Sequence, residues 1–100
     1  MLVLIPINSD DVHEALITSV MEAKIWAQLR IEEGELVEVL HNEKFDAFED
    51  WSEAVVVNSD GESVMDFLNM SMMILVAHTQ KTIDEIVEAY LFRELHDLAY

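Results

Sequence analysis

Polar and acidic side chains follow three apolar runs of this sequence, and they are the residues whose chemistry could serve a function. The triplet Asn-Ser-Asp occurs at residues 8–10 and 58–60, each time after an apolar run, and His78 follows a third run. If these runs form parallel strands, their polar exits meet at one edge of the sheet, where open α/β proteins bind ligands. The predicted ligand-binding residues are Asn8, Asp10, His13, Asn58, Asp60 and His78.

These side chains allow two kinds of metal site. Carboxylate oxygens suit Mg²⁺ or Ca²⁺ and would serve a divalent-cation-dependent hydrolase; the candidate ligands are Asp10, Asp11, Asp60 and Glu62. Imidazoles suit a transition metal, for which His13 and His78 are the candidates, whereas spacing suggests no partner for His41 or His96. Helix capping is the simplest alternative, because Ser and Asp side chains accept hydrogen bonds from the free amides of a first helical turn.

The charge of the chain narrows the classes of partner. It is −16, from 21 acidic and five basic residues. Nucleic acid and anionic membranes are poor partners for such a chain, because phosphate groups bind to surfaces rich in lysine and arginine. A protein partner fits better, and a basic one would complement the charge. A homodimer is an alternative if the aromatic side chains Trp26, Phe45, Phe48 and Trp51 are exposed at a sheet edge.

The sequence contains no pattern of a known catalytic site. There is no cysteine, so the chain itself supplies no disulfide, thiolate ligand or cysteine nucleophile. Ser-His-Asp spacing, a phosphate-binding loop and a His-Glu-x-x-His motif are also missing, so we expect a protein that is not an enzyme. The first residues lack a basic segment, and no apolar run approaches the ~18 residues of a membrane helix, which predicts a cytoplasmic location.

Uninterrupted apolar runs at residues 2–7, 54–57 and 72–77 predict strands that are buried on both faces. Alternating apolar residues over 25–31 and a second extended segment at 36–40 flank Glu32-Glu33-Gly34-Glu35, which predicts a hairpin.

Three capping-box patterns, each with an acidic, serine or threonine residue three positions before a glutamate, predict helix starts. The pairs are Asp11 with Glu14, Ser59 with Glu62, and Thr82 with Glu85. The expected helices cover 12–23, the stretch ending at Asn69, and the stretch from Ile83 toward Leu98. The aromatic residues of 45–51, spaced by three, predict one or two further helical turns that cover a sheet edge.

The order of these elements predicts a single α/β domain over residues 1–100. With strands numbered along the chain, we expect a mixed five-stranded sheet of order 3-2-1-4-5, with strand 2 antiparallel and helices flanking both faces. This is a ribonuclease-H-like, three-layer arrangement.

Four segments carry a resemblance to a known family and together cover most of the chain. They are residues 2–7; residues 27–39, AQLRIEEGELVEV; residues 54–57, AVVV; and residues 82–91, TIDEIVEAYL. The sequence resembles the dinitrogenase iron–molybdenum cofactor biosynthesis domain family, also called NifX-like, whose fold is ribonuclease-H-like.

The resemblance implies a non-enzymatic accessory or binding protein that is related to carriers of metal–sulfur cofactors. Many members have a His-Phe-Gly-Arg-like stretch before the second strand; residues 19–23 stand there in this chain, without the histidine, the glycine or the basic residue. The expectation is therefore a divergent member that has lost its cluster-binding motif. The alternatives are the divalent-cation-dependent hydrolase and a dimeric structural or regulatory module.

Overall fold

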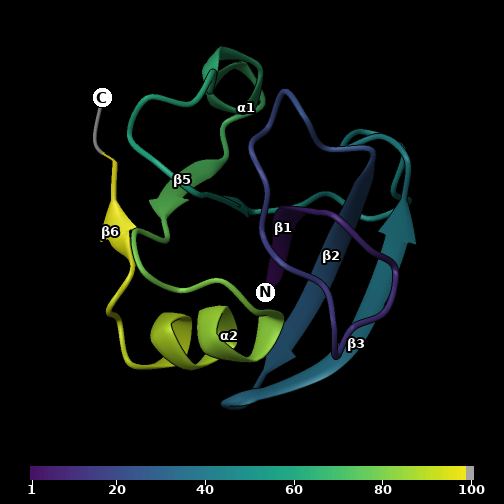
Figure 1. Cartoon of the computed structure of the whole chain (residues 1–100), viewed down its shortest axis with the longest axis vertical. Coiled ribbons are helices and arrows are strands. Elements are labelled where there is room, and N and C mark those ends of the chain that lie inside the picture. The colour runs from purple at the N-terminus through teal and green to yellow at the C-terminus, as the bar shows by residue number, and fades with distance from the viewer. Residues whose placement is uncertain (99–100) are drawn as a thin grey trace.

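The computed structural model describes residues 1–98, so residues 99–100 of the expected domain lie outside the described part. Six strands form one sheet: β1 (Leu2–Ile7), β2 (Ile25–Glu32), β3 (Glu35–Asn42), β4 (Ala54–Val57), β5 (Met73–Val76) and β6 (His96–Asp97). Two helices accompany it, α1 (Met65–Asn69) and α2 (Ile83–Leu91) (Figure 1). The chain is thus a small α/β protein with a mixed sheet.

The strands lie in the order β3-β2-β1-β4-β5-β6. β1, β4 and β5 are mutually parallel, whereas β2 is antiparallel to both of its neighbours and β6 is antiparallel to β5. The sheet differs from the expected one by its sixth strand. That strand arises because α2 ends at Leu91 and the chain then turns back, whereas the sequence suggested a helix that continues toward Leu98.

Both faces of the sheet are covered, which explains the uninterrupted burial of the central strands. Alternate residues of β1 show the division: Val3, Ile5 and Ile7 pack in a core that includes the α2 residues Ile83 and Ile86. Leu4 instead packs in a second core that includes Phe67 of α1. The two helices therefore lie on opposite sides of the sheet (Figure 1).

Both helices end at a non-glycine residue with a left-handed backbone. Ser71, after α1, has φ 61°, and Arg93, after α2, has φ 58°. In each case the next amide donates to a carbonyl five residues back: Met72 N to Phe67 O at 3.0 Å, and Glu94 N to Ala89 O at 2.8 Å. These bonds satisfy carbonyls that the last helical turn leaves free. Because no glycine marks either end, the end of α2 could not be located from a stop signal in the sequence.

Two expected helices are absent from the described residues. Residues 12–23 form two turns separated by an extended segment. Ala15 N is bonded to Asp11 O at 2.8 Å in the first turn, Ile17 pairs with Ile7 in the extended segment, and residues 20–22 form the second turn. The β-branched side chains of Ile17, Thr18 and Val20 disfavour continuation of the helix. Residues 43–53 contain turns and bends instead of a helix, although Phe45 and Phe48 do pack against the core on the α1 side.

Among the described residues, neither helix is long and apolar enough to cross a membrane.

Candidate functional site

The carboxyl ends of β1, β4 and β5 bring three loops together at one edge of the sheet, here called the strand-end rim. The loop after β1 is tied to the other two by backbone and side-chain bonds. Val20 N donates to Glu62 Oε1 at 3.0 Å, and Ile17 N donates to Lys81 O at 2.9 Å. The three loops are therefore joined at one edge of the sheet, and of the predicted ligand-binding side chains Asp60 and His78 are in contact there.

An acid–imidazole pair is the main polar contact across the rim. His78 Nε2 lies 2.6 Å from Asp60 Oδ1, and both side chains are exposed. The His96 ring lies 5.7 Å from the His78 ring, centroid to centroid. His96 is on β6, which sequence analysis missed, so its proximity to His78 was missed as well.

The other predicted residues of the first loop have their polar groups engaged in local structure. Asn8 Oδ1 accepts from Leu16 N at 2.9 Å and closes the loop, while Asp11 Oδ1 accepts from His13 N at 3.0 Å. Asn58 is half-buried, and His13 is exposed. The capping interpretation holds for Asp11 over one turn, but it is wrong for Ser59 and Glu62. α1 begins later, at Met65, with no side-chain cap, and Glu62 binds Val20 instead.

Asp10 belongs to a different part of the surface. It lines a depression with Ile25, His41, Asn42 and Glu43, where β2 begins and β3 ends. Asp60, in contrast, faces His78. Among residues 1–98, no three carboxylate or imidazole groups are close enough to hold a metal ion.

The rim does not fit a metal–sulfur cluster. The chain has no cysteine, and the exposed histidine His78 is already paired with a carboxylate. An anionic cluster would meet repulsion from the acidic side chains of these loops, and Coulomb repulsion between unit charges ~4 Å apart is about 1 kcal/mol even in water.

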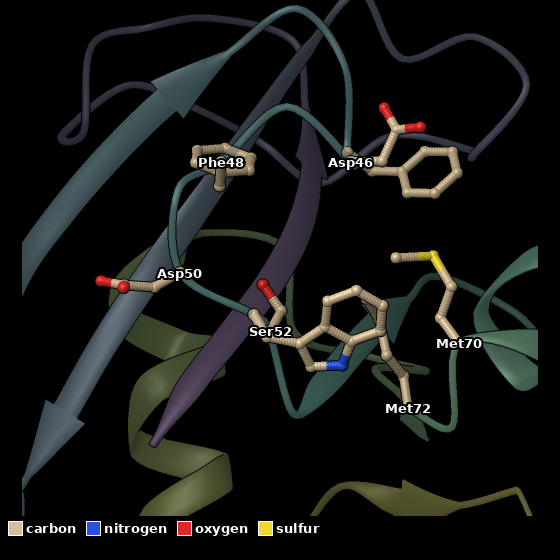
Figure 2. A pocket seen from close by; sticks show the side chains of 8 residues that line it. Asp46, Phe48, Asp50, Ser52, Met70 and Met72 are labelled. Carbon is tan, nitrogen blue, oxygen red and sulfur yellow. The ribbon is translucent and has the colours of Figure 1, made fainter.

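A second feature is a hollow of about 80 Å³ between the loop before β4 and the end of α1; we call it the aromatic hollow. Its lining residues are Phe45, Asp46, Phe48, Asp50, Trp51, Ser52, Met70 and Met72. Figure 2 shows Asp46 and Phe48 on one side and Met70 and Met72 on the opposite side. The aromatic residues spaced by three were the sequence signal for this side of the hollow, but nothing in the sequence indicated that Met70 and Met72 would lie opposite them.

A buried side-chain amide of β2 anchors the loop that forms one wall of the aromatic hollow. Gln28, 2% exposed, donates from Nε2 to Asp50 O at 2.9 Å and to Ser52 Oγ at 2.7 Å. Phe45 packs edge-on against Phe67 and Trp26, with ring centroids 4.9 Å and 5.6 Å apart. These contacts fix the loop even though it has no regular secondary structure.

Arg30, on β2, forms an ion pair with this loop. It lies 2.9 Å from Asp50, 3.4 Å from Glu38 and 3.6 Å from Glu32. Partial desolvation lowers the pKa of Arg30, but the hydrogen bond to Glu38 and the surrounding carboxylates outweigh it, so that the pKa is raised. Arg30 therefore stays charged and offsets only part of the local negative charge.

A further depression lies beside β5, β6 and the end of α2. It has a volume of about 480 Å³ and is mostly apolar. Met1, Met73, Leu75, Tyr90, Arg93, Leu95 and Asp97 line it. Burial raises the pKa of Tyr90, and the charge of Glu53 adds to this effect.

Comparison with known proteins identifies the fold alone. No known family model matches the sequence, and no curated protein matches it significantly. Among solved structures, the chain is similar to the crystal structure of PH0822, with a TM-score of 0.73 and 14% sequence identity, over 98% of this chain and 96% of that chain. The two proteins therefore share an α/β fold over nearly their whole lengths.

Proposed function

We propose that this chain is a non-enzymatic accessory or binding protein whose partner is a positively charged protein. The observation that carries the proposal is the excess of uncompensated carboxylates on the folded molecule. Of the 21 acidic residues, the ion pairs with lysine or arginine among residues 1–98 engage three, all with Arg30: Glu32, Glu38 and Asp50. Such a surface attracts cationic partners over a distance and raises the rate of their encounter.

The proposal includes a distant relationship to the NifX-like family and a ribonuclease-H-like fold. Its support is the strand order from β3 through β5 with β2 antiparallel, together with the four sequence segments that carry the resemblance. The cofactor-carrying role of that family is not part of the proposal, because the donor set at the strand-end rim does not fit a cluster.

No observation favours the hydrolase or the dimeric module. The two carboxylates that the hydrolase needs, Asp10 and Asp60, line different parts of the surface. An interface between two copies of a chain with charge −16 would oppose like charges.

The proposal is tested by retrieving partners from an extract of the source cells with the immobilised chain. The control is Leu4→Asp, which places a carboxylate at a fully buried position and should unfold the chain while keeping its negative charge. We expect a basic protein that binds the folded chain, does not bind the control, and is released when salt rises from about 0.05 M to about 0.5 M. Equal retrieval by both chains, or retention at high salt, would contradict the proposal.

A further inference from the structure

We propose that the aromatic hollow is the site at which this protein receives a lysine or arginine side chain of its partner. The inference rests on the proposed function for the charge of the partner, and it adds the place and the mode of contact. Three observations carry it: the size of the hollow, the chemistry of its lining and the charge of the loop that forms it.

The size of the hollow selects a single side chain as the occupant. Pockets for drug-sized molecules and cofactors have volumes of roughly 300–1,000 Å³. A volume of about 80 Å³ admits only the end of one side chain. A segment of a partner protein that inserts one residue fits this volume, whereas a cofactor does not.

The lining suits a side chain with an apolar stem and a cationic tip. Phe45, Phe48 and Met72 offer apolar contact to the methylene groups of lysine or arginine. Trp51 also lines the hollow and is 62% exposed, so its indole is accessible to a cation. Figure 2 shows the thioether of Met70 directed into the same space.

The charge of the loop favours a cation and disfavours a second copy of this chain. Residues 43–53 contain five carboxylates, Glu43, Asp46, Glu49, Asp50 and Glu53, against the one cation Lys44. A symmetric contact between two copies would bring these carboxylates face to face. Asp46 lines the hollow, and its carboxylate makes no ion pair among the described residues.

The hollow is also preformed. Ser52 is 4% exposed and fixed by the Gln28 amide, and the ring of Phe45 is held between Trp26 and Phe67. A binding site that is already ordered loses little conformational entropy when a partner arrives.

The test is a titration of the full-length chain, labelled with ¹⁵N and with ¹³C in the methionine methyl groups, with hexalysine at low salt. The chain has two tryptophans, and Trp26 is only 4% exposed, so the two indole N–H signals report on different environments. We expect shifts of the Trp51 indole and the Met70 and Met72 methyl groups, with little change at Trp26 and Met1.

Three substitutions make the titration specific. Trp51→Ala should weaken hexalysine binding by about 2- to 5-fold, the range expected of an exposed cation–π contact. Asp46→Asn should weaken binding more than Asp10→Asn, which removes the same charge from another part of the surface. All three positions are exposed, so the variants should fold.

The outcomes separate this inference from the proposed function. Shifts confined to the strand-end rim, or equal losses from Asp46→Asn and Asp10→Asn, overturn the site while a cationic partner still stands. If no residue shifts up to about 10 mM hexalysine, the free energy of binding is weaker than ~3 kcal/mol. That result overturns both the proposed site and the proposed cationic partner. Shifts of Trp51 that depend on protein concentration without peptide identify a second copy as the occupant and also overturn the inference.

Discussion

At the scale of single residues, Gln28 is the polar side chain on which the loop before β4 depends. It is buried in β2, and its amide nitrogen satisfies both the carbonyl of Asp50 and the hydroxyl of Ser52. Its own Oε1 is buried and has no hydrogen-bond partner among residues 1–98. The two bonds from the amide nitrogen offset part of the cost of that unpaired oxygen.

Gln28→Ala should therefore destabilise the protein by about 2–3 kcal/mol, because it leaves the buried Ser52 hydroxyl and the partly buried Asp50 carbonyl without their donor. Urea denaturation followed by circular dichroism measures the change in the free energy of unfolding. Ser52→Ala is the matched control and should cost about 1 kcal/mol, since the amide keeps its bond to the Asp50 carbonyl. If the two variants were equally stable, the bond to Asp50 would contribute nothing.

The residues of the strand-end rim show what the sequence could and could not predict about a site. Repeated polar exits after apolar strands correctly brought Asp60 and His78 to one place. The sequence could not show that Asp10 lines a depression beside β2 and β3, because the course of the loop after β1 depends on tertiary bonds such as Leu16 N to Asn8 Oδ1. It also could not reveal His96, whose position depends on a two-residue strand with no periodicity of its own.

At the scale of elements, the capping box of α2 is a local signal that the structure confirms. Thr82 Oγ1 accepts from Glu85 N at 3.1 Å, and Glu85 Oε1 accepts from Thr82 N at 3.0 Å. Thr82→Ala should reduce the free energy of unfolding by about 1 kcal/mol.

The same capping box makes a pH-dependent contribution. The backbone bonds from Thr82 and Lys81 hold the pKa of Glu85 below its usual value of 4.5. A lowered pKa in the folded state means that the stabilisation is present above the ordinary pKa and is lost as pH falls through the lowered one. Glu85→Gln should thus be less stable than the parent at pH 7, and the difference should shrink toward pH 3.

Glu88→Gln provides the control for that experiment. Glu88 is exposed on the same helix and is outside the capping box, so its removal changes the net charge by the same amount. Urea denaturation of both variants across this pH range separates the two effects. If Glu85→Gln lowered the free energy of unfolding by the same amount at pH 3 as at pH 7, the ionised carboxylate would not be the stabilising form.

The β2–β3 hairpin depends on two left-handed residues, Glu33 at φ 52° and Gly34 at φ 80°. Gly34→Ala should cost about 1–2 kcal/mol for backbone reasons alone, because an added Cβ meets no atom within 4 Å. Glu33→Asn should stabilise the hairpin, since asparagine tolerates this backbone better. Thermal denaturation measures the stability of both variants. Gly61→Ala is the control, because an added Cβ there is equally unobstructed and the φ of Gly61 is not positive. We expect no loss of stability from it.

The elements that the sequence predicted are those with a strong local pattern. The apolar runs of β1, β4 and β5, the acidic-glycine hairpin and the start of α2 all appear where expected. The expected helix over 12–23 is wrong because tertiary bonds, such as Leu16 N to Asn8 Oδ1 and Ile17 N to Lys81 O, compete with the helical ones. The loop over 43–53 was misassigned for a similar reason, since Gln28 fixes it from a distant strand.

At the scale of the whole molecule, the decisive property is the concentration of charge. A net charge of −16 resides on a body with principal extents of 29 × 28 × 23 Å. At about 0.1 M salt the Debye length is near 10 Å, so carboxylates on one face repel one another while opposite faces are screened. The native state therefore holds an unfavourable electrostatic term that expansion of the chain would relieve.

This repulsion predicts that salt stabilises the fold. Raising KCl from about 0.02 M to about 1 M shortens the Debye length to roughly 3 Å and should raise the midpoint of thermal unfolding. KCl is preferred to sulfate, because sulfate also strengthens the burial of apolar groups. A second series at constant low salt with sucrose controls for exclusion of the co-solvent from the surface. A midpoint that stayed constant or fell with KCl would mean that the carboxylates repel one another less than their number implies, and the same long-range field would then be too weak to attract a cationic partner.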